Sequence, residues 1–85
     1  MADEETRFSP CSQMDLRTAA TKAAYEKAKE MEAQGRPGAS RYQALRVEEA
    51  ERFLAFGKQM QEKGICEPMA WSELRAAVDE FFAGK

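Results

Sequence analysis

The fold depends on residues 40–63, SRYQALRVEEAERFLAFGKQMQEK, in which apolar side chains recur with the period of an α-helix over about six turns. These apolar positions cover an arc roughly 200° wide, whereas an ordinary surface helix buries a stripe of about 100°. The arc comprises Tyr42, Leu45, Ala50, Phe53, Phe56, Gly57 and Met60, with Val47 and Leu54 widening it. One neighbouring helix cannot cover so wide an arc, so the sequence predicts that this helix packs against two partners.

The chain before this segment predicts a helix over residues 12–34. Ser12 and Asp15 match a capping box, which we prefer to the alternative start at Ser9-Pro10. Small side chains then follow at a spacing of four residues, in the row Leu16, Ala20, Ala24 and Ala28. Because alanine lets a neighbouring helix approach closely, we expect this face to pack against residues 40–63 in an antiparallel hairpin.

Two loops complete the expected architecture. Residues 35–39 contain glycine and proline and are short enough to fold the chain back, and Ser40 with Gln43 suggests a second capping box. A break at residues 64–68 precedes a third helix near residues 68–82, which carries large aromatic side chains on one face. The predicted fold class is all-α: an antiparallel helical hairpin plus a shorter third helix, forming a small helical bundle.

Composition places this fold in one domain. We expect residues 1–11 to form a flexible acidic N-terminal tail and residues 12–85 a single helical domain. With 44% hydrophobic and 33% charged residues, and no long apolar run, the chain is expected to have no membrane partner and to be cytoplasmic. Its net charge of −2 makes nucleic acid an unlikely partner, because nucleic acid requires a clustered positive surface.

The residues that carry chemistry are sparse. The chain has no histidine, which removes the commonest general base and the commonest metal ligand, so we expect no enzyme, no metal site and no cofactor. Cys11 and Cys66 lack a partner that would activate a thiolate and are interpreted as buried, inert thiols. An antiparallel hairpin places them at the same end of the molecule, but the sequence leaves open whether they form a disulfide.

Charged residues on the central helix have ordinary structural explanations. Glu49 can pair with Arg52 three residues later on a solvated helix face, and Arg46 can pair with Glu49. We therefore expect these charges to be rim or specificity elements rather than catalytic groups.

The leading functional hypothesis is a small non-enzymatic protein–protein interaction module: an adaptor, regulator or inhibitor of a larger cytoplasmic protein. The warrant is the absence of catalytic motifs together with more apolar helix surface than a short chain can bury, which also predicts a homodimer. The expected partner-binding residues are Leu45, Val47, Phe53, Leu54, Phe56, Trp71 and Phe82. The size and the alanine-rich helices are typical of many small bacterial and phage proteins, without pointing to a particular family.

The alternative hypothesis is a small-ligand module. The loop between the first two helices and the start of the next helix combine glycines, arginines, a hydroxyl and an aromatic ring, a combination suited to a phosphate or a carboxylate. The candidate anion-binding residues are Arg36, Ser40, Arg41 and Tyr42. Turn and capping chemistry alone accounts for most of these residue types, which makes the small anionic ligand the second choice.

Overall fold

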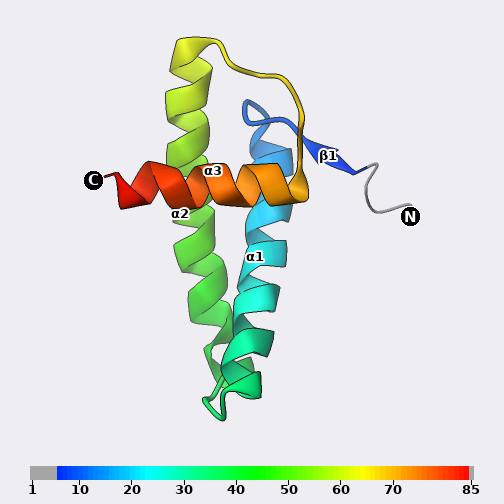
Figure 1. Ribbon diagram of the computed structural model, residues 1–85, viewed down its shortest axis with the longest axis vertical. Helices are drawn as coiled ribbons and strands as arrows, with labels where there is room; N and C mark the ends of the chain where they lie inside the picture. Colours follow the sequence, from blue (N-terminus) through cyan, green and yellow to red (C-terminus); the bar gives the residue numbers. More distant parts are fainter. Residues whose placement is uncertain (1–5, 85) are drawn as a thin grey trace.

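The computed structural model describes residues 6–84 and confirms the all-α fold. Helices α1 (Gln13–Ala33) and α2 (Tyr42–Lys63) form an antiparallel hairpin, and the shorter helix α3 (Trp71–Ala83) crosses one face of it (Figure 1). A single 3₁₀ turn, η2 (Ala39–Arg41), leads into α2. Two very short strands, β1 (Arg7–Phe8) and β2 (Met69–Ala70), pair antiparallel, with Phe8 opposite Met69.

Helix α1 begins where the capping pattern predicts. The Ser12 hydroxyl accepts a hydrogen bond from the Asp15 amide at 3.2 Å, which satisfies one of the unpaired donors at a helix N-terminus. The Asp15 carboxylate does not return to Ser12 but accepts from the Ser9 amide at 2.9 Å. This bond fixes the segment before the helix as well as the helix start.

Helix α2 begins differently from the prediction. Ser40 makes no capping hydrogen bond, and the 3₁₀ turn η2 occupies the place of the expected first turn. The far end of α2 agrees with the sequence, since Gly64 adopts the left-handed conformation at φ 73° and the Ile65 amide donates to the Met60 carbonyl at 3.0 Å. The capping box at Ser40 is therefore a wrong prediction, and a residue of α1 takes over its role, as described below.

Helix α3 starts three residues later than expected. Pro68 lies outside the helix, because Met69 and Ala70 pair with β1 before α3 begins at Trp71. The Glu73 carboxylate accepts from the Ala70 amide at 3.1 Å and so closes the first turn of α3. The short strand pair has no alternating apolar pattern in the sequence, which explains why no strand was expected.

Residues 7–11, assigned to the tail from the sequence, pack onto the helical domain. Phe8 is 5% exposed, its ring meets that of Trp71 edge-on with centroids 5.9 Å apart, and Pro10 is fully buried. The acidic residues 3–5 of the predicted tail lie outside the described residues.

A disulfide between Cys11 and Cys66 closes the open end of the hairpin, with the two Cα atoms 5.2 Å apart. The prediction that both cysteines lie at the same end of the molecule is confirmed. Their interpretation as buried, inert thiols is wrong, because Cys66 is exposed and both sulfur atoms are bonded. The antiparallel return of the chain makes this pairing possible, since it brings residues 55 positions apart within disulfide reach.

The core lies where α3 covers the hairpin. It contains alanines and Leu16 from α1, Phe53 and Phe56 from α2, Leu74 and Val78 from α3, and Phe8 from β1. The Phe53 ring stacks on Trp71 and the Phe56 ring meets Phe81 edge-on, so α3 supplies the bulk that the alanine face of α1 lacks.

Candidate functional site

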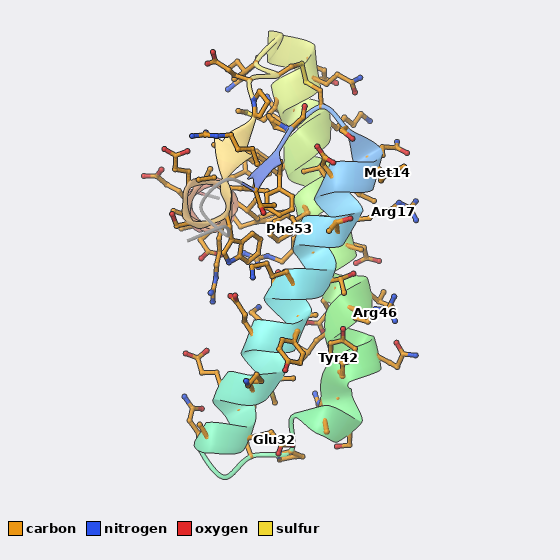
Figure 2. All side chains as sticks on the ribbon, turned by 90° about the vertical axis from the view of Figure 1, so that its right-hand side faces the viewer. Met14, Arg17, Glu32, Tyr42, Arg46 and Phe53 are labelled. Atoms are coloured by element: carbon orange, nitrogen blue, oxygen red, sulfur yellow. A yellow bond between two sulfur atoms is a disulfide. The ribbon has the colours of Figure 1, made fainter. Side chains whose placement is uncertain are left out.

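The hairpin has one covered and one uncovered face. Figure 2 shows Phe53 between the hairpin and α3, whereas Met14, Arg17 and Arg46 lie on the side of the hairpin away from α3. Met14 is 76% exposed and Val47 is 60% exposed, although both are apolar. The uncovered face therefore presents apolar side chains of both long helices to solvent.

Two hollows lie on this face, between α1 and α2. The first, which we call the arginine hollow, has a volume of about 360 Å³ and is lined by Arg17, Thr21, Gln43, Arg46, Val47 and Ala50. The second, the tyrosine hollow, has a volume of about 640 Å³ and is lined by Tyr25, Ala28, Lys29, Glu32, Ala39 and Tyr42. Arg46 joins them, because its guanidinium lies 5.8 Å from the centre of the Tyr42 ring. We call the two hollows together the hairpin groove.

Among the described residues, the cations of the hairpin groove have no carboxylate partner. The Arg17 side chain makes no ion pair within residues 6–84, and Lys29 lies over the Tyr25 ring at 5.3 Å. Arg46 donates a hydrogen bond to the side-chain oxygen of Gln43 at 3.4 Å and lies over the Tyr42 ring, and it makes no ion pair in the part of the chain that the structure describes. The groove thus carries a positive charge that the described part of the chain does not neutralise.

The covered side of the hairpin has the opposite character, because its cations are paired. Glu26 of α1 accepts from Arg75 at 2.7 Å and from the Trp71 indole at 3.2 Å, and Lys22 lies 3.6 Å from the same carboxylate. These bonds fix α3 against α1. The cations Lys22 and Arg75 are thereby paired, unlike the cations of the hairpin groove.

Glu49 lies at the centre of a second ionic cluster on the covered side. Its carboxylate is 1% exposed and binds Lys27 of α1 at 2.7 Å and Arg52 at 3.0 Å, and Arg52 also binds Asp79 of α3 at 3.1 Å. Burial by itself lowers the pKa of Arg52, but the hydrogen bond to Asp79 and the charge of Glu49 outweigh it and raise that pKa. The cluster links three helices.

This cluster corrects two expectations. The Glu49–Arg52 pair forms, but Glu49 is buried rather than on a solvated face, and it pairs with Lys27 instead of Arg46. The reason is that α1 approaches α2 closely enough at its alanines for the Lys27 ammonium to reach across.

The loop between α1 and α2 is held by Glu32. Its carboxylate accepts hydrogen bonds from the Gly38 amide at 3.0 Å and from the Ala39 amide at 2.8 Å (Glu32 is labelled in Figure 2). The bond from Ala39, followed by that from Gly38, lowers the pKa of Glu32, and slight desolvation of the exposed carboxylate opposes them. Glu32 therefore supplies, from within the chain, the carboxylate for which the start of the second helix is suited.

The structure does not bring the four candidate anion-binding residues together. Arg36 and Arg41 line a hollow with Leu45 on the other face of the hairpin, while Tyr42 lines the tyrosine hollow. The Arg36 guanidinium donates to Gln34 at 3.0 Å, and Ser40 is exposed without a side-chain hydrogen bond in the described chain. The amides nearest to them are already bound to Glu32.

The expected partner-binding residues also lie on different surfaces. Phe53 and Phe56 are 1% and 4% exposed, so the expectation that Phe56 stays uncovered in the monomer is wrong, because α3 packs directly over it. Leu54, Trp71 and Phe82 are half-buried against the same core. Of the predicted set, Val47 lines the hairpin groove and Leu45 lines the hollow on the opposite face.

Sequence reasoning missed Arg17, Tyr25 and Lys29. Arg17, Thr21, Tyr25, Ala28 and Glu32 recur every three or four residues on one face of α1, a signal visible in the sequence. The direction from which α3 covers the hairpin decides whether that face is free, and this direction depends on tertiary contacts.

Within residues 6–84 there is no group of three or more acidic or cysteine side chains arranged to hold a metal ion. No buried side-chain polar atom in this part of the chain lacks a hydrogen-bond partner. None of the described helices is long and apolar enough to cross a membrane. Comparison of the chain with protein-family models, curated proteins and solved structures finds no match.

Proposed function

We propose that this protein is a non-enzymatic protein–protein interaction module that binds its partner through the hairpin groove. The observation that carries the proposal is the uncovered face of the hairpin, where Met14, Val47 and Tyr25 are 76%, 60% and 54% exposed. Helix α3 covers the opposite face. Exposed apolar side chains rimmed by polar ones are typical of docking surfaces.

A test compares the tagged wild-type chain with Val47→Glu, which places a charge inside the groove, and with Ala44→Glu, which places the same charge on an exposed position of α2 outside the groove. We expect a protein to co-purify in stoichiometric amount with the wild type and with Ala44→Glu, and to be lost with Val47→Glu. Mass spectrometry identifies and quantifies it. Equal recovery with all three chains contradicts docking at the groove, and the absence of any stoichiometric partner contradicts the function.

The homodimer expected from the sequence loses part of its basis. Phe53 and Phe56 belong to the core, and Leu45 and Val47 line different hollows. A two-fold contact at the hairpin groove would also bring the cations of both copies, Arg17, Lys29 and Arg46, into one interface, which is unfavourable for like charges. We therefore propose a different protein as the partner.

The small-ligand alternative stays a prediction. Glu32 already occupies the Gly38 and Ala39 amides, so a phosphate or carboxylate would have to displace it. Phosphate titration followed by amide chemical shifts of residues 35–42 tests this, and unchanged shifts at those residues remove the alternative.

The compartment is part of the proposal. Disulfides persist in oxidising environments and are rare in the cytosol, so the Cys11–Cys66 bond favours an oxidising compartment over the cytoplasmic location expected from the sequence. Rapid alkylation of the protein in intact source cells, followed by mass spectrometry, distinguishes the two. Blocked thiols at both cysteines would restore the cytoplasmic assignment.

A further inference from the structure

The charge of the hairpin groove indicates which kind of partner it accepts. Arg17, Lys29 and Arg46 line it without a carboxylate partner in the described chain, and the one lining carboxylate, Glu32, is bound to two backbone amides. This local excess of positive charge contrasts with the net charge of −2 for the whole chain. A partner carrying acidic side chains at the matching positions is favoured electrostatically.

The shape of the groove indicates the form of the partner. Arg17 and Glu32 mark its ends along α1 and are fifteen residues apart, a distance of about 22 Å at the rise of an α-helix. Its floor includes Ala28 and Ala50, whose short side chains leave room between the two long helices. A helix of about four turns from a partner protein, lying along this groove, would bury an apolar stripe of residues spaced at i, i+3, i+4 and i+7.

We propose that the hairpin groove binds an acidic amphipathic helix of a partner protein, whose apolar stripe contacts Val47 and Tyr25 and whose flanking Asp or Glu residues pair with Arg17, Lys29 and Arg46. This inference rests on the proposed function and adds the chemical class of the partner. Tyr25 and Tyr42 add aromatic surface to the groove, and Lys29 and Arg46 lie over those rings at 5.3 and 5.8 Å, so acidic residues beside the apolar stripe of the helix would meet these cations.

The test is a selection from a displayed library of helical peptides about fifteen residues long, with all surface positions randomised, on the immobilised full-length oxidised protein. We expect the enriched peptides to have helical apolar periodicity and an excess of Asp and Glu. Synthetic copies of them should bind the double variant Arg17→Glu/Arg46→Glu at least tenfold more weakly than wild type, and Val47→Glu likewise. Ala44→Glu should bind as wild type does, and circular dichroism checks that each variant is folded.

Salt provides an independent readout. The Debye length, the distance over which a charge acts before salt screens it, falls from about 10 Å at 0.1 M salt to about 3 Å at 1 M. Binding of the selected peptides should therefore weaken as the salt concentration is raised. Enrichment of basic or aperiodic peptides, no enrichment, or binding that the groove variants leave unchanged would overturn the inference. A wild-type dimer in light scattering that Val47→Glu dissociates would also overturn it, by assigning the groove to a second copy.

The two proposals fail in different ways. If a co-purified protein depends on Val47 while the library yields no acidic helices, the interaction function stands and the acidic helix is wrong. If the library yields acidic helices that depend on the groove while no partner co-purifies, the inferred chemistry stands and the interaction function is wrong.

Discussion

At the scale of single residues, Gly57 determines how closely α1 and α2 approach. A Cβ atom at this position would overlap Leu16 Cδ1 and lie 2.9 Å from the Pro10 carbonyl oxygen. Leu16 is only 2% exposed and Pro10 is followed by the disulfide, so neither neighbour can move away easily. Glycine fits at this position because the space for a methyl group is occupied.

We predict that Gly57→Ala lowers the free energy of unfolding by up to about 2 kcal/mol, because overpacking costs about 1–3 kcal/mol and is offset in part by the roughly 1 kcal/mol by which alanine is the better helix former. Urea denaturation measures it. Ala55→Gly, at an exposed position of the same helix, is the control and should also destabilise, by about 1 kcal/mol. If Gly57→Ala stabilises the protein, the close contact is not present.

Glu32 gives the protein a pH-dependent loop. Its pKa is lowered from the ordinary glutamate value of 4.5, so the charged form is favoured in the folded state. The contribution of this carboxylate to stability is present above pH 4.5 and is lost as the pH falls through the lower folded value. We predict that Glu32→Gln has a lower melting temperature than wild type at pH 7, and that the difference shrinks towards pH 3. Thermal unfolding followed by circular dichroism measures both.

The matched control for this prediction is Glu30→Gln. Glu30 is exposed on the same helix and makes no side-chain hydrogen bond or ion pair within residues 6–84. Its substitution should leave the melting temperature nearly unchanged. A Glu32→Gln difference that persists unchanged at pH 3 would show that the carboxylate charge is not what holds the loop.

At the scale of secondary-structure elements, the Glu49 cluster connects α1, α2 and α3. We predict that Glu49→Gln lowers the free energy of unfolding by about 2 kcal/mol, because it removes charge-assisted hydrogen bonds to Lys27 and Arg52 at a buried position. Chemical denaturation measures the change. Glu51→Gln, two residues away and exposed, should change stability by less than about 0.5 kcal/mol. Equal effects of the two substitutions would mean that the cluster does not stabilise the packing.

Periodicity and local chemistry were enough to predict the helices and most of their ends. The Ser12 cap, the Gly64 terminus and the hairpin all depend on interactions within a few residues of sequence, or on a face that repeats along one helix. The start of α2 was missed because its capping group, Glu32, belongs to another helix. The β1–β2 pair was missed because two residues are too few to show alternation.

The candidate site was harder to predict for the same reason. The sequence shows that α2 has an apolar arc too wide for one neighbour, but the parts of the arc that stay exposed depend on how α3 is placed. Both Phe56 and Val47 were expected at the surface, but Phe56 lies in the core and only Val47 is exposed. Arg17 can be identified as a candidate binding residue only once α3 is known to lie on the opposite side of the hairpin.

At the scale of the whole molecule, the disulfide closes a loop of 55 residues that contains both long helices. We predict that the double variant Cys11→Ser/Cys66→Ser unfolds with a free energy lower by about 4 kcal/mol, the chain-entropy value for a loop of this length. Urea denaturation with and without dithiothreitol measures it. The wild type should lose the same stability in the reductant, and the variant should not respond to it. A wild type that is insensitive to full reduction would contradict the prediction.

The covalent link has a further consequence for a chain that is cut. Residues 34–37 form the exposed turn of the hairpin, and exposed turns are where proteases act first. Cys11 lies before this turn and Cys66 lies after it, so the disulfide still joins the two fragments of a molecule that has been cleaved at the turn. The halves then face each other at a high effective concentration and can reassemble without diffusing apart. A nicked protein of this kind migrates as a single species until a reductant divides it.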